Sequence, residues 1–166
     1  MDTPDHPVVA VALDALVAAD RGLTPISAIV RDEIAAVVID GERGRYIVFA
    51  HPDGDQWTTH GTTFGAPRPS GPRHAHTLPW EPLQRLGARF RSATADRTGE
   101  GWFAVIGRAA QDAMSLSVVS CMEEQVVAIG ADGLAFAVVR AIGSEQPRVT
   151  VITRDGRRFA VGPRAA

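Results

Sequence analysis

The stretch QVVAIGADGLAFAVV, residues 125–139, decides the fold class. Two short runs rich in Val and Ala flank Asp132-Gly133, a residue pair that favours a tight reversal between strands. Each run has the length of a strand and contains β-branched residues. The interval between the runs is too short for the crossover helix that parallel strands require. We therefore expect antiparallel strands here, joined by a turn.

Similar runs extend this pattern in both directions along the chain. VTVITRDGRRFAV, residues 149–161, repeats the arrangement around Asp155-Gly156. Short strands at nearly regular spacing, separated by such turns, are typical of a β-sandwich or barrel. Six strands are predicted: Trp102–Ile106, Met114–Val119, Gln125–Ile129, Leu134–Val139, Val149–Thr153 and Arg158–Val161.

The last 65 residues or so, from GWFAVIGRAA (101–110) through DAMSLSVVS (112–120) to the final hairpin, resemble immunoglobulin-like or fibronectin-type sandwiches. The resemblance lies in the strand pattern and the Asp-Gly turns. Cys121 is the one cysteine, so the paired cysteines of antibody domains are missing. The resemblance implies a fold class and no particular function, because such folds carry many functions. Residues 1–80 resemble no family.

The N-terminal region predicts a helix that packs on a sheet. Pro7 suits a first helical turn, and Asp5 is placed to cap it. Asp20-Arg21-Gly22 predicts the end of the helix, with Gly22 free to adopt a left-handed conformation. An apolar stripe follows from three- and four-residue spacing: Val9, Leu13, Leu16 and Val17.

Three short runs then predict a small antiparallel meander. They are IAAVVI at 34–39, RYIVFAH at 45–51 and QWTT at 56–59. Asp40-Gly41 and a second Asp-Gly pair at 53–54 are the expected turns. With the preceding helix, the fold class is mainly β, or α+β: a helix and meander, followed by a C-terminal antiparallel β-sandwich.

A proline-rich segment, residues 65–82, separates these two parts. It holds five of the eleven prolines, and proline prevents a continuous helix or a central strand. The predicted organisation is therefore a helix-plus-meander subdomain at 1–64, a linker at 65–82 and a sandwich-like domain at 83–166. Beyond the linker, Leu83, Leu86 and Phe90 have helical spacing, which favours a helical turn passing into a strand.

Composition places the chain among ordinary globular proteins. Its 166 residues are 45% hydrophobic and 22% charged, with a formal net charge of -2. All 17 basic residues are arginine, and the abundance of Ala, Gly and Val indicates a GC-rich bacterial genome. The N-terminus is acidic, unlike a signal peptide, and the apolar run at 7–19 is too short to span a bilayer. We therefore expect a cytoplasmic protein with no membrane partner.

Four of the five histidines are the candidate metal ligands. Two flank the predicted hairpin at 53–54, and two form a His-x-His step in the linker, where an extended backbone would turn both imidazoles the same way. Asp53 and Asp55 would complete a site of mixed nitrogen and oxygen ligands. The alternative is that all four histidines lie on the surface without a ligand. The candidates are His51, His60, His74 and His76.

Sequence motifs for catalysis are missing, and no catalytic residue is predicted. Cys121 follows a predicted strand, the serines within 115–120 alternate as strand residues do, and no Gly-x-Ser-x-Gly elbow occurs. A chain without lysine lacks the phosphate-binding loop that ends in Lys followed by Ser or Thr. The carboxylate pairs at 32–33 and 123–124 fall at strand ends, where they are normally solvated.

The candidate interaction residues are Trp80, Arg85, Arg89 and Arg91. Trp80 either docks the linker onto the domain or anchors a partner. Arg85 and Arg89 would share a face if their segment were helical. Nucleic acid is not expected as a partner, because the chain is weakly acidic and its few aromatic residues are not interleaved with these arginines.

The sequence thus favours a non-catalytic interaction or assembly module without a cofactor, whose partner is another protein or a second copy of the chain. It would act through an exposed sheet edge or through the linker around Trp80. One alternative is a small enzyme that binds a divalent metal or a ligand through the four histidines. Another is a homo-oligomeric structural subunit assembled by strand addition.

Overall fold

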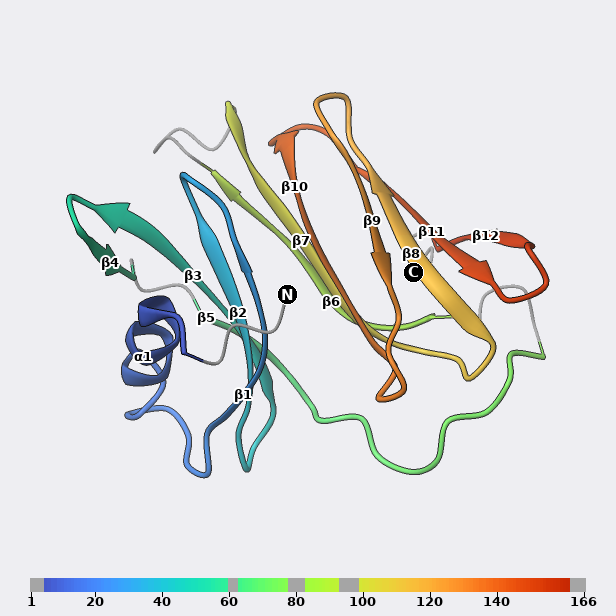
Figure 1. Ribbon diagram of the computed structural model, residues 1–166, viewed down its shortest axis with the longest axis horizontal. Helices are drawn as coiled ribbons and strands as arrows, with labels where there is room; N and C mark the ends of the chain where they lie inside the picture. The colour runs from blue at the N-terminus through green and yellow to red at the C-terminus, as the bar shows by residue number, and fades with distance from the viewer. Residues whose placement is uncertain (1–4, 60–62, 78–82, 93–98, 162–166) are drawn as a thin grey trace. The chain divides into compact units, whose positions relative to one another are not determined.

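The fold is mainly β, as the sequence predicts. The computed structural model describes residues 5–59, 63–77, 83–92 and 99–161, and these hold one helix and twelve strands (Figure 1). The chain divides into two compact units, residues 1–69 and 70–166. The boundary between the units falls inside the proline-rich segment.

The first unit packs a helix on an antiparallel sheet. Its elements are α1 (Pro7–Asp14), β1 (Thr24–Val30), β2 (Ala35–Asp40), β3 (Arg45–Asp53), β4 (Gln56–Thr58) and β5 (Thr63–Ala66). The sheet order is β1-β2-β3-β4, and β5 also pairs with β3. The predicted meander corresponds to β2, β3 and β4, whereas β1 and β5 were not predicted.

Helix α1 covers one face of this sheet (Figure 1). His6 caps it through Nδ1, which accepts a hydrogen bond from the Val8 amide at 3.2 Å, so the prediction of an Asp5 cap was wrong. The cap is the residue directly before the first helical residue, Pro7, and that residue is His6. Val17 is 67% exposed because the helix already ends at Asp14, so the helical periodicity does not reach it.

Asp20 ties the connection after the helix to the β2–β3 turn. Its carboxylate accepts hydrogen bonds from the amides of Arg21 (2.7 Å) and Arg43 (2.9 Å) and from the Tyr46 hydroxyl (2.8 Å). Burial alone would raise the pKa of Asp20, but these hydrogen bonds hold it below its ordinary value. A Cβ atom on Gly41 would lie 2.3 Å from the Asp20 carboxylate. Glycine is therefore needed at 41 for close approach.

The Asp-Gly pairs of the first unit make two different turns. The predicted hairpin at 40–41 is confirmed, because β2 and β3 pair up to Asp40 and Arg45, and its loop spans four residues, with a 2.8 Å hydrogen bond from the Gly41 amide to the Gly44 carbonyl. Gly54 has a φ of 60°, so the predicted turn between β3 and β4 is confirmed. Gly22 has a φ of 61°, as predicted, but the prediction that residues 20–22 end the helix was wrong, because α1 ends at Asp14.

The second unit is a β-sandwich. Its strands are β6 (Leu83–Ser92), β7 (Glu100–Ala109), β8 (Ala113–Val119), β9 (Glu124–Ala128), β10 (Leu134–Ile142), β11 (Arg148–Thr153) and β12 (Arg158–Ala160). One sheet has the order β10-β7-β6 and the other has the order β12-β11-β8-β9 (Figure 1). Its core takes alternate residues from both sheets, among them Val105, Val139, Leu116 and Val151, each at 0% exposure.

Two predictions in this unit need correction. Asp132-Gly133 does not join paired strands, because β9 and β10 belong to different sheets and the turn crosses between them. Residues 83–92 form a strand throughout, without a helical turn. Leu86 sits at a register shift between Arg85 and Gly87, and this bulge produces the spacing that resembles a helix.

Within the described residues, no helix has the length and apolar character needed to cross a membrane.

Candidate functional site

The proline-rich segment is fastened to the second unit over residues 70–77. Proline has no backbone N–H, so other groups must supply the donors. The Arg73 guanidinium donates to the carbonyls of Ala109 (2.9 Å), Ala110 (2.8 Å) and Ala131 (2.7 Å). Arg73 therefore joins this segment to the ends of two loops.

A second arginine holds the beginning of the same segment. Arg108, in β7, donates to the carbonyl of Ser70 at 2.8 Å and to the carbonyl of Gly71. The Gln111 amide donates to the His74 carbonyl at 2.8 Å. Residues 70–77 are thus held to the second unit by hydrogen bonds that involve Arg73, Arg108 and the Gln111 amide.

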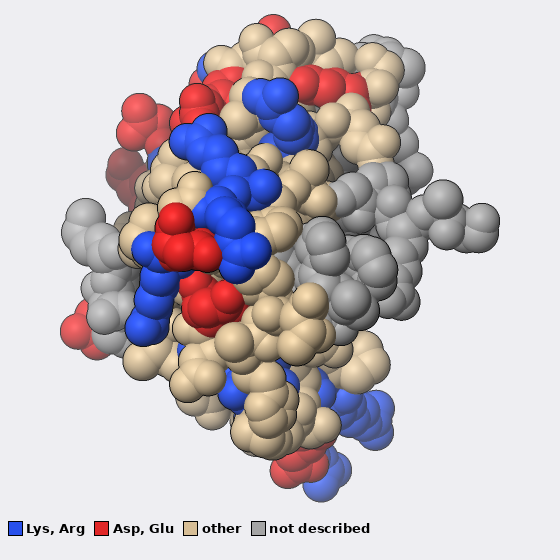
Figure 2. Space-filling view, turned by 90° about the vertical axis from the view of Figure 1, so that its right-hand side faces the viewer, with Lys and Arg blue, Asp and Glu red and all other residues tan. Residues whose placement is uncertain are grey.

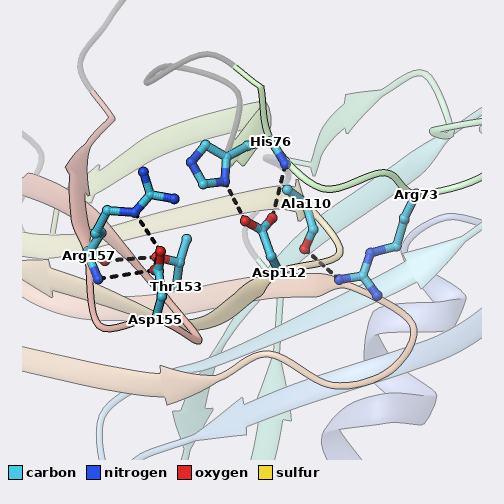
Figure 3. Close-up of polar contacts among 7 residues, drawn as sticks. All are labelled: Arg73, His76, Ala110, Asp112, Thr153, Asp155 and Arg157. Carbon is cyan, nitrogen blue, oxygen red and sulfur yellow. Dashed lines mark hydrogen bonds and ion pairs between the residues drawn. The ribbon is translucent and has the colours of Figure 1, made fainter.

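His76 and Asp112 form the most enclosed polar pair of this region (Figure 3). Nδ1 of His76 lies 2.5 Å from Asp112 Oδ2, and the His76 amide donates to Oδ1 at 3.0 Å. The His76 side chain is 5% exposed and its ring meets the Phe159 ring edge-on at 4.6 Å. Burial alone would raise the pKa of Asp112, but the hydrogen bonds from the His76 amide and imidazole hold it below its ordinary value.

The neighbouring β11–β12 hairpin holds a second carboxylate in place (Figure 3). Asp155 accepts a hydrogen bond from the Thr153 hydroxyl at 2.5 Å and one from Nε of Arg157 at 2.6 Å. The Thr153 hydroxyl and then Arg157 lower the pKa of Asp155 to about 2. The Arg157 guanidinium also lies 5.5 Å from the Phe159 ring centroid. The Phe159 ring therefore contacts both the His76 imidazole and the Arg157 guanidinium.

A cleft of about 280 Å³ opens beside the fastened segment. This volume is near the lower end of small-molecule sites, which are about 300–1,000 Å³. The Gln84 and Arg108 positions lie opposite each other on β6 and β7. The lining residues are Pro72, Arg73, His74, Ala75, His76, Gln84, Arg108, Ala109 and Ala110.

The His76–Asp112 pair has the geometry of a base and the group that orients it in a hydrolytic triad. A triad also needs a nucleophile within hydrogen-bond reach of the imidazole. Among the described residues, no Ser, Thr or Cys makes a hydrogen bond to His76. Because Asp112 binds both the amide and the ring of His76, its clear effect is to fix the backbone of this segment.

The four candidate metal ligands are divided between the two units of the chain. His51 lies in β3 of the first unit, while His74 and His76 belong to the second unit, and His60 lies outside the described residues. His74 is exposed whereas His76 is buried beside Asp112. No group of three or more His, Cys, Asp or Glu within the described ranges could hold a metal ion. The metal site therefore stays a prediction.

The candidate interaction residues are only partly described. Trp80 lies outside the described residues. The backbone of β6 places Arg85, Arg89 and Arg91 opposite Gly107, Ala104 and Trp102 of β7. Since β6 is a strand, the argument that Arg85 and Arg89 share a helical face does not apply. Cys121 is exposed, and its amide donates to Glu145 Oε1 at 2.6 Å.

Sequence reasoning missed Asp112, Arg73 and Arg108. Arg73 and Arg108 bond to backbone carbonyls, and the Asp112 carboxylate bonds to the amide and the imidazole of His76. All these partners are far away in the chain, and such partners leave no spacing signal. One signal was available for Arg73: an arginine among prolines is well placed to supply the donors that the prolines lack.

The sheet edges of the two units differ in how their backbone groups are protected. In β10, the Val138 amide donates to Gln125 Oε1 at 2.7 Å and the Arg140 amide donates to Glu123 Oε2 at 2.8 Å. These two side chains come from the region of β9. In contrast, β1 has one neighbour, β2, and no strand on its other side among the described residues.

No family model, no curated protein and no solved structure matches this chain.

Proposed function

We propose that this chain is a non-catalytic interaction or assembly module of the bacterial cytosol, and that a partner adds a strand to β1. The main support for this proposal is the open edge of the first sheet, which is formed by β1. β1 is seven residues long, TPISAIV, contains no charged side chain, and is at least partly exposed at every position. The next strand, β2, is buried at its first five positions. An uncharged, open edge of this length is a template for strand addition.

The other edges support this choice by contrast. β4 and β12 have three residues each, and Arg157 and Arg158 flank the start of β12. The edge strand β9 has five residues and begins with Glu124, and the ten-residue sequence of the edge strand β6 contains three arginines. Short and charged edges disfavour pairing. In β10, the side chains of Gln125 and Glu123 occupy backbone donors that an added strand would need. β1 is thus the least protected long edge in the described chain.

If a partner adds a strand to β1, its recognition depends on both the main chain and the side chains of β1. Main-chain hydrogen bonds supply affinity, and alternate side chains supply specificity. Ala28 and Val30 pack against the core beneath α1. On that face a partner strand would extend the apolar layer beside them. Pro25 and the register shift beside it disrupt the start of β1, so the pairing stretch would be residues 27–30.

Charge distribution favours a protein partner over nucleic acid. The face seen in Figure 2 carries a row of arginine side chains that acidic side chains flank and interrupt. With a net charge of -2, the chain has no strong electrostatic attraction to a phosphate backbone.

To test strand addition at β1, a positive charge is introduced separately into two edge strands, β1 and β12. Ser27→Lys introduces a cation into β1, and Ala160→Lys introduces the same cation into β12 as a matched control. Each variant of the full chain is analysed by light scattering for self-association, and is used as bait against lysate of the native host. We expect Ser27→Lys to lose the assembly or the retained proteins, while Ala160→Lys behaves as wild type.

Melting curves show whether both variants are folded. If folded Ser27→Lys keeps the wild-type mass and the wild-type set of retained proteins, β1 is not the binding edge.

A further inference from the structure

The cleft beside residues 70–77 has a local charge opposite to that of the chain. Its lining includes Arg73 and Arg108 and no Asp or Glu, whereas the whole chain has a net charge of -2. His74 and His76 also line it. The cleft is therefore a concentration of cationic and neutral donors.

Neither guanidinium is neutralised by a carboxylate among the described residues. Arg73 uses three N–H groups and Arg108 uses two, all on backbone carbonyls. A guanidinium carries five N–H donors, so two remain on Arg73 and three on Arg108. Carbonyl oxygens hold the groups but leave their charge uncompensated.

These bonds also fix both arginines before any ligand arrives. A free arginine loses rotamer freedom when it binds a ligand, and this loss lowers the affinity. Arg73 is held by carbonyls from two loops and Arg108 by the segment it anchors. Much of this ordering cost is therefore met in the free protein.

We propose that this cleft binds a small oxyanion, a phosphate or carboxylate group, through the spare donors of Arg73 and Arg108. Guanidinium groups match the geometry of both oxyanions. The exposed His74 lies in the lining, where it can add a further donor. The site is independent of strand addition at β1, because all its residues belong to the second unit.

The test is an NMR titration of the ¹⁵N-labelled full chain at low salt, with inorganic phosphate in one arm and acetate in the other. We expect saturable amide shifts confined to residues 73–76 and 108–110. The arm with the lower Kd identifies the preferred oxyanion. If neither titration saturates, or if the shifts spread over exposed arginines elsewhere, the proposal is overturned.

Gln84→Glu is the decisive variant, because position 84 lies directly opposite Arg108. A carboxylate there would compete for the guanidinium without removing any of the hydrogen bonds that hold residues 70–77. We expect Kd to rise at least tenfold. Gln146→Glu makes the same change at an exposed position outside the cleft, and its Kd should stay within twofold of wild type. If Gln84→Glu and Gln146→Glu changed Kd equally, the proposal that this cleft binds the oxyanion would be overturned.

Arg108→Gln provides a second variant, with its melting curve measured beside its Kd. Weaker binding by a folded Arg108→Gln protein supports the site. Unchanged Kd in this variant contradicts it.

Discussion

The strands β1 and β10 end their sheets in opposite ways. β1 presents an uncharged edge that has no further strand beside it in the described chain, whereas side chains from the β9 region occupy the amides of Val138 and Arg140 in β10. The second unit also uses side chains to fasten its proline-rich segment. The difference teaches that an edge strand can be closed by side chains that its neighbours place against it, as well as by its own length and charge.

The largest effect is expected at the anchor that precedes β1. Asp20→Ala removes the acceptor of three hydrogen bonds, from two amides and the Tyr46 hydroxyl. Hydrogen-bond donors that lose their acceptor in a buried environment destabilise the folded state. We therefore expect the melting temperature of the first unit to fall by about 15 °C.

Tyr46→Phe is the graded control for Asp20→Ala, because it removes one of the three bonds. It should lower the melting temperature by about a third as much. Equal melting of Asp20→Ala and wild type would show that β1 does not depend on this anchor.

A smaller effect is expected from two glycines with similar backbone conformations. Gly133 and Gly54 both have positive φ, 76° and 60°. A Cβ on Gly133 would lie 2.2 Å from Arg73 Nε, while a Cβ on Gly54 meets nothing within 4 Å. Gly54→Ala should cost about 1 kcal/mol from strain alone, and Gly133→Ala about 2 kcal/mol. Denaturant unfolding measures both, and equal costs would contradict the role of Arg73 as a fastener.

Removing the Gln125 side chain that protects the edge of β10 should have a smaller effect on stability. Gln125→Ala leaves the Val138 amide without its side-chain acceptor, so we expect a loss of about 1 kcal/mol in urea unfolding. It should also create self-association that Ser27→Lys does not remove, since the new edge is β10. Val126→Ala, at an exposed position of the same strand, is the control. If Gln125→Ala stays at wild-type mass, its side chain is not what protects β10.

The smallest effect concerns acid stability. The folded-state pKa of Asp155 is about 2, below the ordinary value of 3.8. Its contribution to stability is therefore complete above 3.8 and is lost as pH falls towards 2. The carboxylate is exposed, so the change should be slight. Unfolding of wild type and Asp155→Asn at pH 5, 3 and 2 measures it, and parallel pH profiles would contradict the assignment.

Much of the fold could be predicted because alternation and turn pairs are local signals. Six of the seven sandwich strands and three strands of the first unit lie close to their predicted places. β1 was missed because Pro25 interrupts it, although an edge strand tolerates proline. β6 was misjudged because a bulge at Leu86 imitates helical spacing. These errors fall where tertiary pairing overrides local pattern.

The candidate site was less accessible to prediction. His76 was selected for its neighbour His74, yet its partner is Asp112, 36 residues further along the chain. Arg73 and Arg108 were not selected at all, because their acceptors are backbone carbonyls that any residue could provide. A spacing rule cannot find a contact whose partner is an ordinary backbone group.

The amino-acid sequence by itself determined that this chain would fold mainly into antiparallel strands, because short apolar runs and glycine turns act within a few residues. Only the tertiary structure decided which strand edge stays open, and which cations gather beside residues 70–77. Both depend on chain segments that are distant in sequence and meet only when the core forms, so their hydrogen bonds follow from packing and not from local pattern.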